Sequence, residues 1–182
     1  MPRARRVAVY VLLAVLLAPA AARGEPCAMP HKPSGLAAAS VVRVVDGDTL
    51  VVRLADGRST RVRMIGIDTP ELRPSDKLTR DAQRSGQDAA AIQALGAKAA
   101  AFTKKHLTGR RVEMERDATA LDRYGRALAY VWVGDELYNL VIVREGYAGL
   151  LTMPPNVKYA DTLAACHRAA REGRRGLWAA RE

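Results

Sequence analysis

Histidine and cysteine are scarce in this chain, with three histidines and two cysteines among 182 residues. Cys27 and Cys166 lie too far apart for the ligand spacing of a structural zinc site. Only three other side chains could assist them: His31, His106 and His167. Two cysteines suffice for one disulfide bond in an oxidising compartment, so we expect a Cys27–Cys166 bond, which would constrain a long loop of the unfolded chain.

A membrane-length apolar run is also lacking. Residues 7–22 form a run of 16 residues that contains Pro19, whereas a membrane-spanning helix needs about 20 residues. Three arginines precede this run and three alanines end it, which is typical of a secretory leader removed after Ala22. We expect residues 1–22 to be a signal peptide and the mature protein to be secreted or periplasmic. The alternative is that the apolar segment stays and anchors the protein.

Acidic residues are outnumbered, with 19 Asp and Glu against 29 Lys and Arg, so the formal net charge is +10. Loss of the leader removes three arginines and leaves +7. This excess favours a polyanionic partner, although a charge that only maintains solubility is the alternative. There are no internal repeats, and the remaining length suits one domain, here expected to be a monomer. We expect a lead-in over residues 23–40, a domain over 41–178 and a tail over 179–182.

The order of apolar runs and turn residues predicts an α+β domain. Valine-rich residues 41–54, interrupted at residues 46–48, are expected to form a hairpin with residues 59–67, the interruption being a bend in the first strand. Further strands are expected at 112–116 and 127–133. One helix is expected over 89–107, capped by Asp88 and with Gly96 as a weak point. A short helix capped by Asn139 should run through Arg144, and a last helix should run from the Pro154-Pro155-Asn156 breaker to Arg171. Five short strands and three helices fit an oligonucleotide-binding (OB-type) β-barrel, with a generic α+β sandwich as the alternative.

Two acidic segments stand at the ends of the apolar runs. Asp46 and Asp48 are two residues apart, so on a regular strand both carboxylates would leave one face and approach one cation. Asp68 and Thr69 precede a proline that favours extended backbone and a free Thr69 carbonyl, with Glu71 three residues after Asp68. Each segment taken alone also fits ordinary turn or helix-start chemistry.

Arginines accompany these acids. Arg63 lies beside the apolar residues 64–67, where a guanidinium is costly unless a carboxylate or a phosphate completes it. Arg126 follows the turn Asp122-Arg123-Tyr124-Gly125, where a solvated arginine needs no special explanation. Carboxylates supply oxygen ligands for a divalent cation and arginines match phosphate oxygens two at a time. The combination is typical of metal-assisted phosphodiester hydrolysis.

Five segments together resemble the staphylococcal nuclease (thermonuclease) family, and the similarity extends roughly over residues 41–178. They are Val-Asp-Gly-Asp-Thr at 45–49, residues 63–71, Ala-Phe-Thr-Lys-Lys at 101–105, Asp-Arg-Tyr-Gly-Arg-Ala-Leu-Ala-Tyr at 122–130, and Gly-Leu-Trp at 176–178. The resemblance implies a five-stranded OB-type barrel with three helices. It also implies calcium-dependent hydrolysis of DNA and/or RNA that leaves 3′-phosphate ends.

The resemblance assigns roles to individual residues. Asp48, Asp68 and the Thr69 carbonyl would hold calcium, with Asp46 nearby in the next layer.

The catalytic groups implied by the family are Glu71 as the general base on the attacking water, and Arg63 and Arg126 as donors to the charged five-coordinate phosphorus. Tyr124 and Arg123 would contact the nucleotide. None of the three histidines falls within the motifs, which leaves Glu71 as the better base.

Two features depart from the family pattern. The segment from Leu72 to Gly96 is longer and basic, and it could gate or grip nucleic acid or remain a solvated loop. Residues 151–156, Leu-Thr-Met-Pro-Pro-Asn, lack the tyrosines that family members place against the nucleotide, and Tyr124 is retained. Loss of a stacking platform would weaken binding or change base preference.

Two other functions compete with the nuclease. A nucleic-acid-binding OB module without catalysis would explain the charge and the fold, but it has no use for Glu71 among positive groups. A structural or interaction domain attached to the envelope would leave all of the acids and arginines unexplained.

Overall fold

The computed structural model describes residues 27–179. The predicted leader, residues 1–22, lies outside this range, as does most of the predicted tail. Within residues 27–179, no helix is both long enough and apolar enough to span a membrane.

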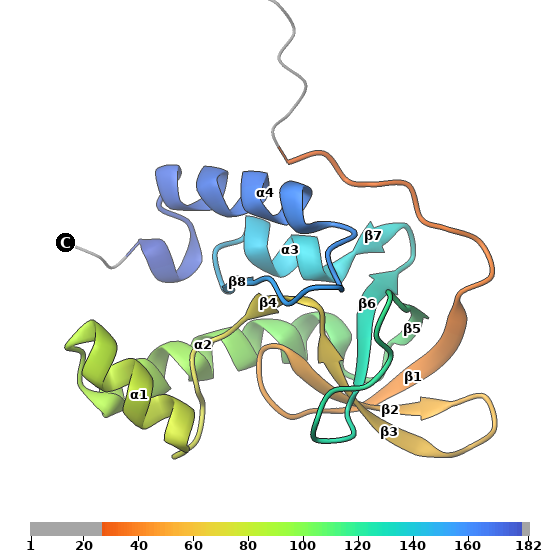
Figure 1. The fold of residues 1–182 in the computed structure, drawn as a ribbon, viewed down its shortest axis with the longest axis horizontal. Coiled ribbons are helices and arrows are strands. Elements are labelled where there is room, and N and C mark those ends of the chain that lie inside the picture. Colours follow the sequence, from red (N-terminus) through yellow and green to blue (C-terminus); the bar gives the residue numbers. More distant parts are fainter. Residues whose placement is uncertain (1–26, 180–182) are drawn as a thin grey trace, which may run out of the picture.

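Five strands close into a barrel, which confirms the predicted fold class (Figure 1). Their hydrogen-bonded order is β3-β2-β1-β5-β6, and β3 pairs in parallel with β6 to close the ring. Alternating valine and leucine side chains point inward, so that Leu50, Val62 and Trp132 are fully buried. The strands are β1 (Ala37–Val44), β2 (Thr49–Leu54), β3 (Ser59–Met64), β5 (Arg111–Glu115) and β6 (Ala127–Val133).

The valine-rich run is two strands, and the prediction of one bent strand is wrong. β1 and β2 pair antiparallel from Ala39↔Leu54 to Val44↔Leu50, so residues 45–48 form the turn between them. A run with a central Asp-Gly-Asp has the composition of either a bulge or a turn, and only the pairing partner distinguishes the two. Asp46 and Asp48 therefore project from a turn at the barrel end and not from one strand face.

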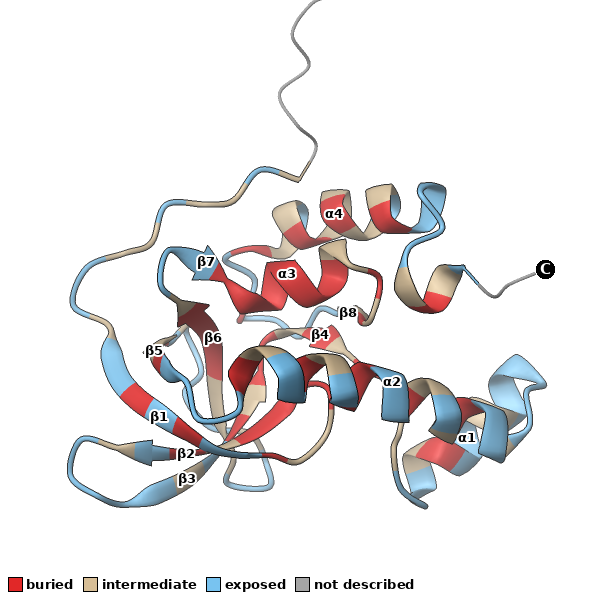
Figure 2. Cartoon of the chain, turned by 180° about the vertical axis from the view of Figure 1, so that it is seen from behind, coloured by how far each residue is buried: buried red, intermediate tan, exposed pale blue. Residues whose placement is uncertain are grey.

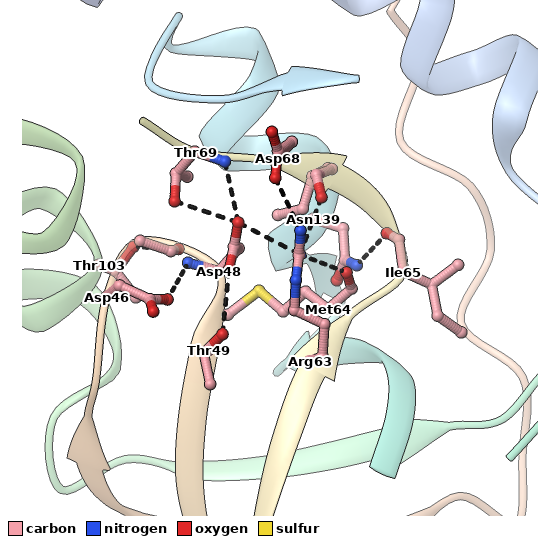
Figure 3. Close-up of polar contacts among 12 residues, drawn as sticks. Asp46, Asp48, Thr49, Arg63, Met64, Ile65, Asp68, Thr69, Thr103 and Asn139 are labelled. Carbon is pink, nitrogen blue, oxygen red and sulfur yellow. Dashed lines mark hydrogen bonds and ion pairs between the residues drawn. The ribbon is translucent and has the colours of Figure 1, made fainter. Parts of the chain in front are cut away.

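Three short strands of the described residues lie outside the closed ring. β7 (Glu136–Leu137) pairs with β6, while β4 (Gly66–Asp68) leaves the sheet after β3 and pairs with β8 (Gly149–Leu151). The expected strand over residues 59–67 is thus divided at Ile65. Because β4 departs from the barrel, Asp68 and Thr69 lie beside the β1–β2 turn that carries Asp48 (Figure 3).

Four α-helices and a short 3-10 helix accompany the barrel: α1 (Asp76–Ser85), α2 (Ala89–Leu107), α3 (Tyr138–Arg144), α4 (Ala160–Glu172) and η1 (Gly176–Trp178). α2 and α4 agree with the prediction. α1 was not predicted, and it forms within the basic segment that had been expected as a loop or an insertion. Figure 2 shows α3 as the most deeply buried helix, next to α4, with α1 and α2 side by side.

Of the two predicted helix caps, Asp88 is confirmed in position and Asn139 is wrong, because Leu137 is the N-cap of α3. Asp88 occupies the N-cap position of α2, but its side chain makes no capping hydrogen bond. Asn139 is buried inside α3, where its side chain accepts from the Val131 N–H at 2.8 Å and donates to the Ile65 carbonyl at 2.9 Å. A residue suited to capping thus joins β6 to the β3–β4 connection, because burial demands a partner for each of its polar atoms.

The predicted disulfide is present between Cys27 and Cys166, whose Cα atoms are 4.6 Å apart. It attaches the extended segment before β1 to α4. Lys32 of the same segment forms an ion pair with Glu113 of β5 at 2.6 Å, so this lead-in is held at two points.

Candidate active site

The β1–β2 turn presents the first carboxylate. Asp48 is buried, and its Oδ2 accepts hydrogen bonds from the Thr69 backbone N–H at 2.8 Å and the Thr69 hydroxyl at 3.1 Å (Figure 3). Gly47 makes this approach possible, because an added Cβ would lie 2.6 Å from Thr69 Cγ2. The buried Thr103 of α2 donates to the Gly47 carbonyl at 2.8 Å and holds the turn from behind.

Arg63 joins the turn to β4. Its guanidinium contacts Asp48 Oδ2 at 3.2 Å and Asp68 Oδ1 at 2.9 Å, and it donates to the Met64 and Ile67 carbonyls. Only 11% of this side chain is exposed. An arginine so buried requires compensating partners, and it has two carboxylates and two carbonyls. The expectation that Arg63 needs a carboxylate or a phosphate is therefore met by carboxylates in this state.

Glu71 lies beyond Asp68 and Thr69, where the chain passes close to α2. An added Cβ on Gly96 would be 2.5 Å from the Glu71 carbonyl oxygen, so glycine there lets the Glu71 backbone rest directly on the helix. Gly96 was expected as a weak point of the helix, yet α2 continues through it. The Ser75 hydroxyl donates to Glu71 Oε2 at 3.3 Å.

Lys77 of α1, which lies outside the predicted set of site residues, completes this group. Its Nζ lies 3.1 Å from Asp68 Oδ2, 3.0 Å from Glu71 Oε1 and 3.3 Å from the Thr69 carbonyl oxygen. It also lies 3.6 Å from Asp81, one turn further along α1. The sequence contained no signal beyond one lysine among several basic residues of a long segment, since its partners depend on where α1 packs.

The concentration of acids shifts their proton affinity. Burial, reinforced by the neighbouring Asp48 carboxylate, raises the pKa of Asp46 to about 6. Burial also raises the pKa of Asp68, although the Lys77 and Arg63 charges oppose the shift. For Lys77, burial acts to lower the pKa, but Asp68 and Glu71 outweigh it and the pKa is raised. The clustered acids therefore favour positive charge in the site: Asp46 and Asp68 bind a proton more readily than exposed carboxylates do, and the Lys77 ammonium holds its proton more strongly.

A second group of residues faces these acids from the turn before β6. Arg126 forms a 2.6 Å ion pair with Asp122, whose other oxygen accepts the Tyr124 and Arg126 backbone N–H groups. Tyr124 is 68% exposed, and the guanidinium carbons of Arg123 and Arg126 lie 4.8 and 5.5 Å from its ring centroid. This turn thus presents an aromatic ring and two arginines to solvent.

One cavity of about 570 Å³ brings the two groups together. All nine residues predicted for the site line it: Asp46, Asp48, Arg63, Asp68, Thr69, Glu71, Arg123, Tyr124 and Arg126. We call residues 46–48, Arg63 and 68–71 the acid wall, and residues 121–126 the turn wall. Where the sequence lacks the family's tyrosines, the cavity is lined by Leu151, Met153, Pro154 and Pro155.

The cavity holds oxygen atoms that could bind a cation, but several of them already contact the Lys77 ammonium. Among residues 27–179, no three Asp, Glu, His or Cys side chains form a ready metal cluster. Instead, one oxygen each of Asp68, Thr69 and Glu71 lies within 3.3 Å of the Lys77 nitrogen, and Asp48 is joined to Asp68 through Arg63. This donor set of carboxylates and a carbonyl has the chemistry that suits a hard divalent cation, and in this structure its oxygens contact the Lys77 ammonium.

Comparison with known proteins agrees with this geometry. Residues 61–180 match the family model described as staphylococcal nuclease homologue. The thermonuclease of Staphylococcus intermedius is 40% identical over 139 residues, which are 76% of this chain and 74% of that protein. The thermonuclease of Staphylococcus hyicus is 37% identical over 155 residues, covering 82% and 83%. Endonuclease YncB of Bacillus subtilis is 28% identical over 138 residues, covering 75% and 59%. The chain therefore belongs to the staphylococcal nuclease family.

Proposed function

We infer that this chain is a calcium-dependent nuclease that hydrolyses phosphodiester bonds of DNA and/or RNA and leaves 3′-phosphate ends. One observation carries the inference. In a chain of this family, one cavity is lined by three carboxylates and two arginines that come from separate elements: Asp48, Asp68, Glu71, Arg63 and Arg126. The names of the related thermonucleases and endonuclease support the reaction class.

The acid wall offers the cation ligands. Asp48, Asp68 and the Thr69 carbonyl would hold calcium, with Asp46 behind them. Calcium accepts several oxygens in a flexible geometry and, when bound, polarises a phosphoryl oxygen and positions water. The hydrogen bonds from Thr69 and Thr49 to Asp48 hold that carboxylate in place before any ligand arrives.

Glu71 serves as the general base in this proposal. Its carboxylate is partly exposed to the cavity and can accept a proton from a water molecule there. The water oxygen forms a bond to phosphorus while the bond from phosphorus to the 5′-oxygen breaks. The leaving 5′-oxygen takes a proton from solvent, and the phosphate remains on the 3′-oxygen.

Arg63 and Arg126 face the phosphate from opposite walls of the cavity. Charge increases on the phosphoryl oxygens in the transition state, so fixed donors aimed at them accelerate the reaction. Arg63 is oriented by carbonyls as well as by carboxylates, which keeps its planar fork in one position. Arg126 would exchange Asp122 for a phosphate oxygen when substrate binds.

The substrate base would meet Tyr124 and the apolar residues that line the same cavity. Exposed Tyr124, Leu121 and Met153 all line the cavity. Stacking of a base on an aromatic ring is worth about 1 to 3 kcal/mol, and the aliphatic residues offer contact without that stacking geometry. We propose that Tyr124 and Arg123 bind the nucleotide.

The test is a cleavage assay on single-stranded DNA with the purified protein, in calcium or in excess chelator. The nuclease proposal expects cleavage that requires calcium and that falls by about two to four orders of magnitude in Glu71→Gln, as for loss of a general base. Glu136→Gln, an exposed change on β7, is the matched control and should leave the rate unchanged.

Two outcomes contradict the proposal. Binding of DNA without cleavage in any divalent cation would favour a nucleic-acid-binding barrel without catalysis. Cleavage that is equally fast in Glu71→Gln would remove Glu71 from the reaction. A polynucleotide kinase tests which ends the products carry. Products with 3′-phosphates have free 5′-hydroxyls, which the kinase can phosphorylate directly, whereas products with 5′-phosphates cannot be phosphorylated there.

We also propose that the protein acts outside the cytoplasm. The Cys27–Cys166 disulfide supports an oxidising compartment, and residues 1–22 have the composition of a leader. Mass spectrometry of the protein from its native source checks this: a chain that begins near residue 23 and carries an intact disulfide is expected, and an unprocessed chain would contradict it.

A further inference from the structure

Lys77 occupies the point at which the acid wall would hold its cation. Two of the three groups proposed as calcium ligands, Asp68 and the Thr69 carbonyl, are also partners of the Lys77 nitrogen. The third partner is Glu71, the proposed base. Lys77 therefore engages both the cation ligands and the base at once.

An ammonium and a divalent cation cannot share these oxygens. Calcium requires oxygens at 2.3–2.6 Å, so a calcium ion on Asp68 and Thr69 would lie within a few ångström of the Lys77 nitrogen as placed here. Two positive charges at that separation repel, and the oxygen lone pairs that face Lys77 would no longer be available to calcium.

We propose that Lys77 is an internal competitor for the cation site: its ammonium fills the oxygen cage in the resting protein, and a divalent cation must displace it to bind and to free Glu71. This inference rests on the proposed function. It makes α1 an autoinhibitory element that couples cation binding to release of the base.

The attachment of α1 is suited to such a displacement. Leu78 is the one buried residue among Asp76–Ser85, so little apolar surface holds the helix in place. The Ser75 side chain accepts from the Leu78 N–H at the start of α1 and also donates to Glu71, which links the helix start to the base.

Asp81 gives the displaced ammonium a partner. It lies four residues after Lys77 on the same helix, and its Oδ2 is already 3.6 Å from the Lys77 nitrogen. Lys77 can therefore leave Asp68 and Glu71 while it keeps an ion pair within α1. The displaced lysine keeps this ion pair and does not become an isolated charge. The free energy needed to displace it is therefore small enough for cation binding to supply.

The direct test is a calorimetric titration of the purified full chain with calcium, without substrate, at fixed ionic strength. Lys77→Met removes the competitor and should lower the calcium dissociation constant by about tenfold or more, within the usual range of coupling between two binding events. Lys98→Met, an exposed lysine of α2, removes the same charge and should change the constant by less than about twofold. An equal or weaker affinity in Lys77→Met overturns the proposal.

Asp68→Asn separates failure of this inference from failure of the proposed function. If calcium binding is lost in Asp68→Asn but unchanged in Lys77→Met, the cation site stands and the competitor does not. If neither the wild type nor Lys77→Met binds calcium, the cation site itself is wrong.

Thermal unfolding gives a second readout that does not depend on activity. In excess chelator, Lys77→Met leaves Glu71 without the Lys77 ammonium and Asp68 with Arg63 as its cation, and should unfold roughly 2 to 4 °C below the wild type. In saturating calcium the two proteins should unfold at the same temperature, because the Lys77 ammonium is displaced in the wild type and absent from the variant. A deficit of the same size in calcium and in chelator would show that the Lys77 contacts persist beside the ion.

Discussion

The acid wall and the turn wall are held in place by different kinds of contact. On the acid wall, Arg63 of β3 joins Asp48 of the β1–β2 turn to Asp68 of β4, and Lys77 reaches in from α1. On the turn wall, Arg126 pairs with Asp122, only four residues away, and Tyr124 stands exposed between them. The acid wall is thus part of the tertiary structure, whereas the turn wall is a local motif.

This difference separates function from stability. A change on the acid wall should affect catalysis and folding together, because buried charges lose their partners. A change on the turn wall should affect catalysis with less effect on folding, because its partly buried Asp122–Arg126 ion pair joins two residues of one turn and connects no distant elements. Four predictions test this distinction, from the largest expected effect to the smallest.

Arg63→Lys is expected to lower the cleavage rate by about two to three orders of magnitude, as for loss of a fixed electrostatic donor. An ammonium cannot reproduce a fork that contacts two carboxylates and two carbonyls, so the unfolding free energy should also fall, by roughly 1 to 3 kcal/mol. Cleavage kinetics and urea unfolding measure both effects. Arg61→Lys, at an exposed position of the same strand, is the control, and near wild-type activity in Arg63→Lys would remove Arg63 from the mechanism.

Arg126→Ala should lower the cleavage rate by about two orders of magnitude while changing the unfolding free energy by less than about 1 kcal/mol. Its guanidinium contacts Asp122 and the Tyr124 ring within one turn, and after its removal the Asp122 carboxylate keeps the hydrogen bonds from the Tyr124 and residue 126 backbone N–H groups. The same two assays apply. A stability loss as large as that of Arg63→Lys would show that the turn wall is not a local motif.

Gly96→Ala should destabilise the protein by roughly 1 to 3 kcal/mol, because the added methyl group would overlap the backbone carbonyls of Pro70 and Glu71. Helix propensity alone predicts the opposite sign, since alanine is favoured over glycine by about 1 kcal/mol in a helix. The sign of the change in urea midpoint therefore decides whether α2 positions Glu71 by close contact. A gain in stability with unchanged cleavage would contradict that role.

Asp122 of the turn wall should make a pH-dependent contribution to the unfolding free energy, and this is the smallest of the four expected effects. Burial acts to raise its pKa, but the backbone N–H and the guanidinium of Arg126 and the Tyr124 N–H outweigh burial, and the pKa lies below the ordinary value of 3.8. A carboxylate with a lowered folded pKa stabilises the fold fully above its unfolded pKa and loses that contribution as the pH falls through the folded value.

The difference in unfolding free energy between the wild type and Asp122→Asn should therefore be constant from neutral pH down to about pH 4.5, and should shrink below pH 3.8. Urea unfolding at several pH values measures it. A difference that grows on acidification would mean that the Asp122 pKa is raised, contrary to its hydrogen bonds.

Much of the fold could be predicted because its signals are local. Residues 89–107 and 127–133 have the composition and periodicity of one helix and one strand, and both form as predicted. The Asp-Gly-Asp segment was placed correctly but was predicted as a bend, because the turn that it makes depends on which strand β1 pairs with. Asn139 was predicted as a cap, and its buried hydrogen bonds depend on β6 and the residues after β3.

The sequence by itself determined the chemistry of the cavity and the class of the fold. Carboxylates, arginines and the residues that punctuate the strands are properties of short segments, and their order along the chain indicates the family. Only the tertiary structure decided which charges meet. Arg63 lies between Asp48 and Asp68 because the barrel closes, and Lys77 reaches Glu71 because α1 packs beside α2. Such contacts join residues whose separation in space is set by the whole fold and not by their spacing in the chain.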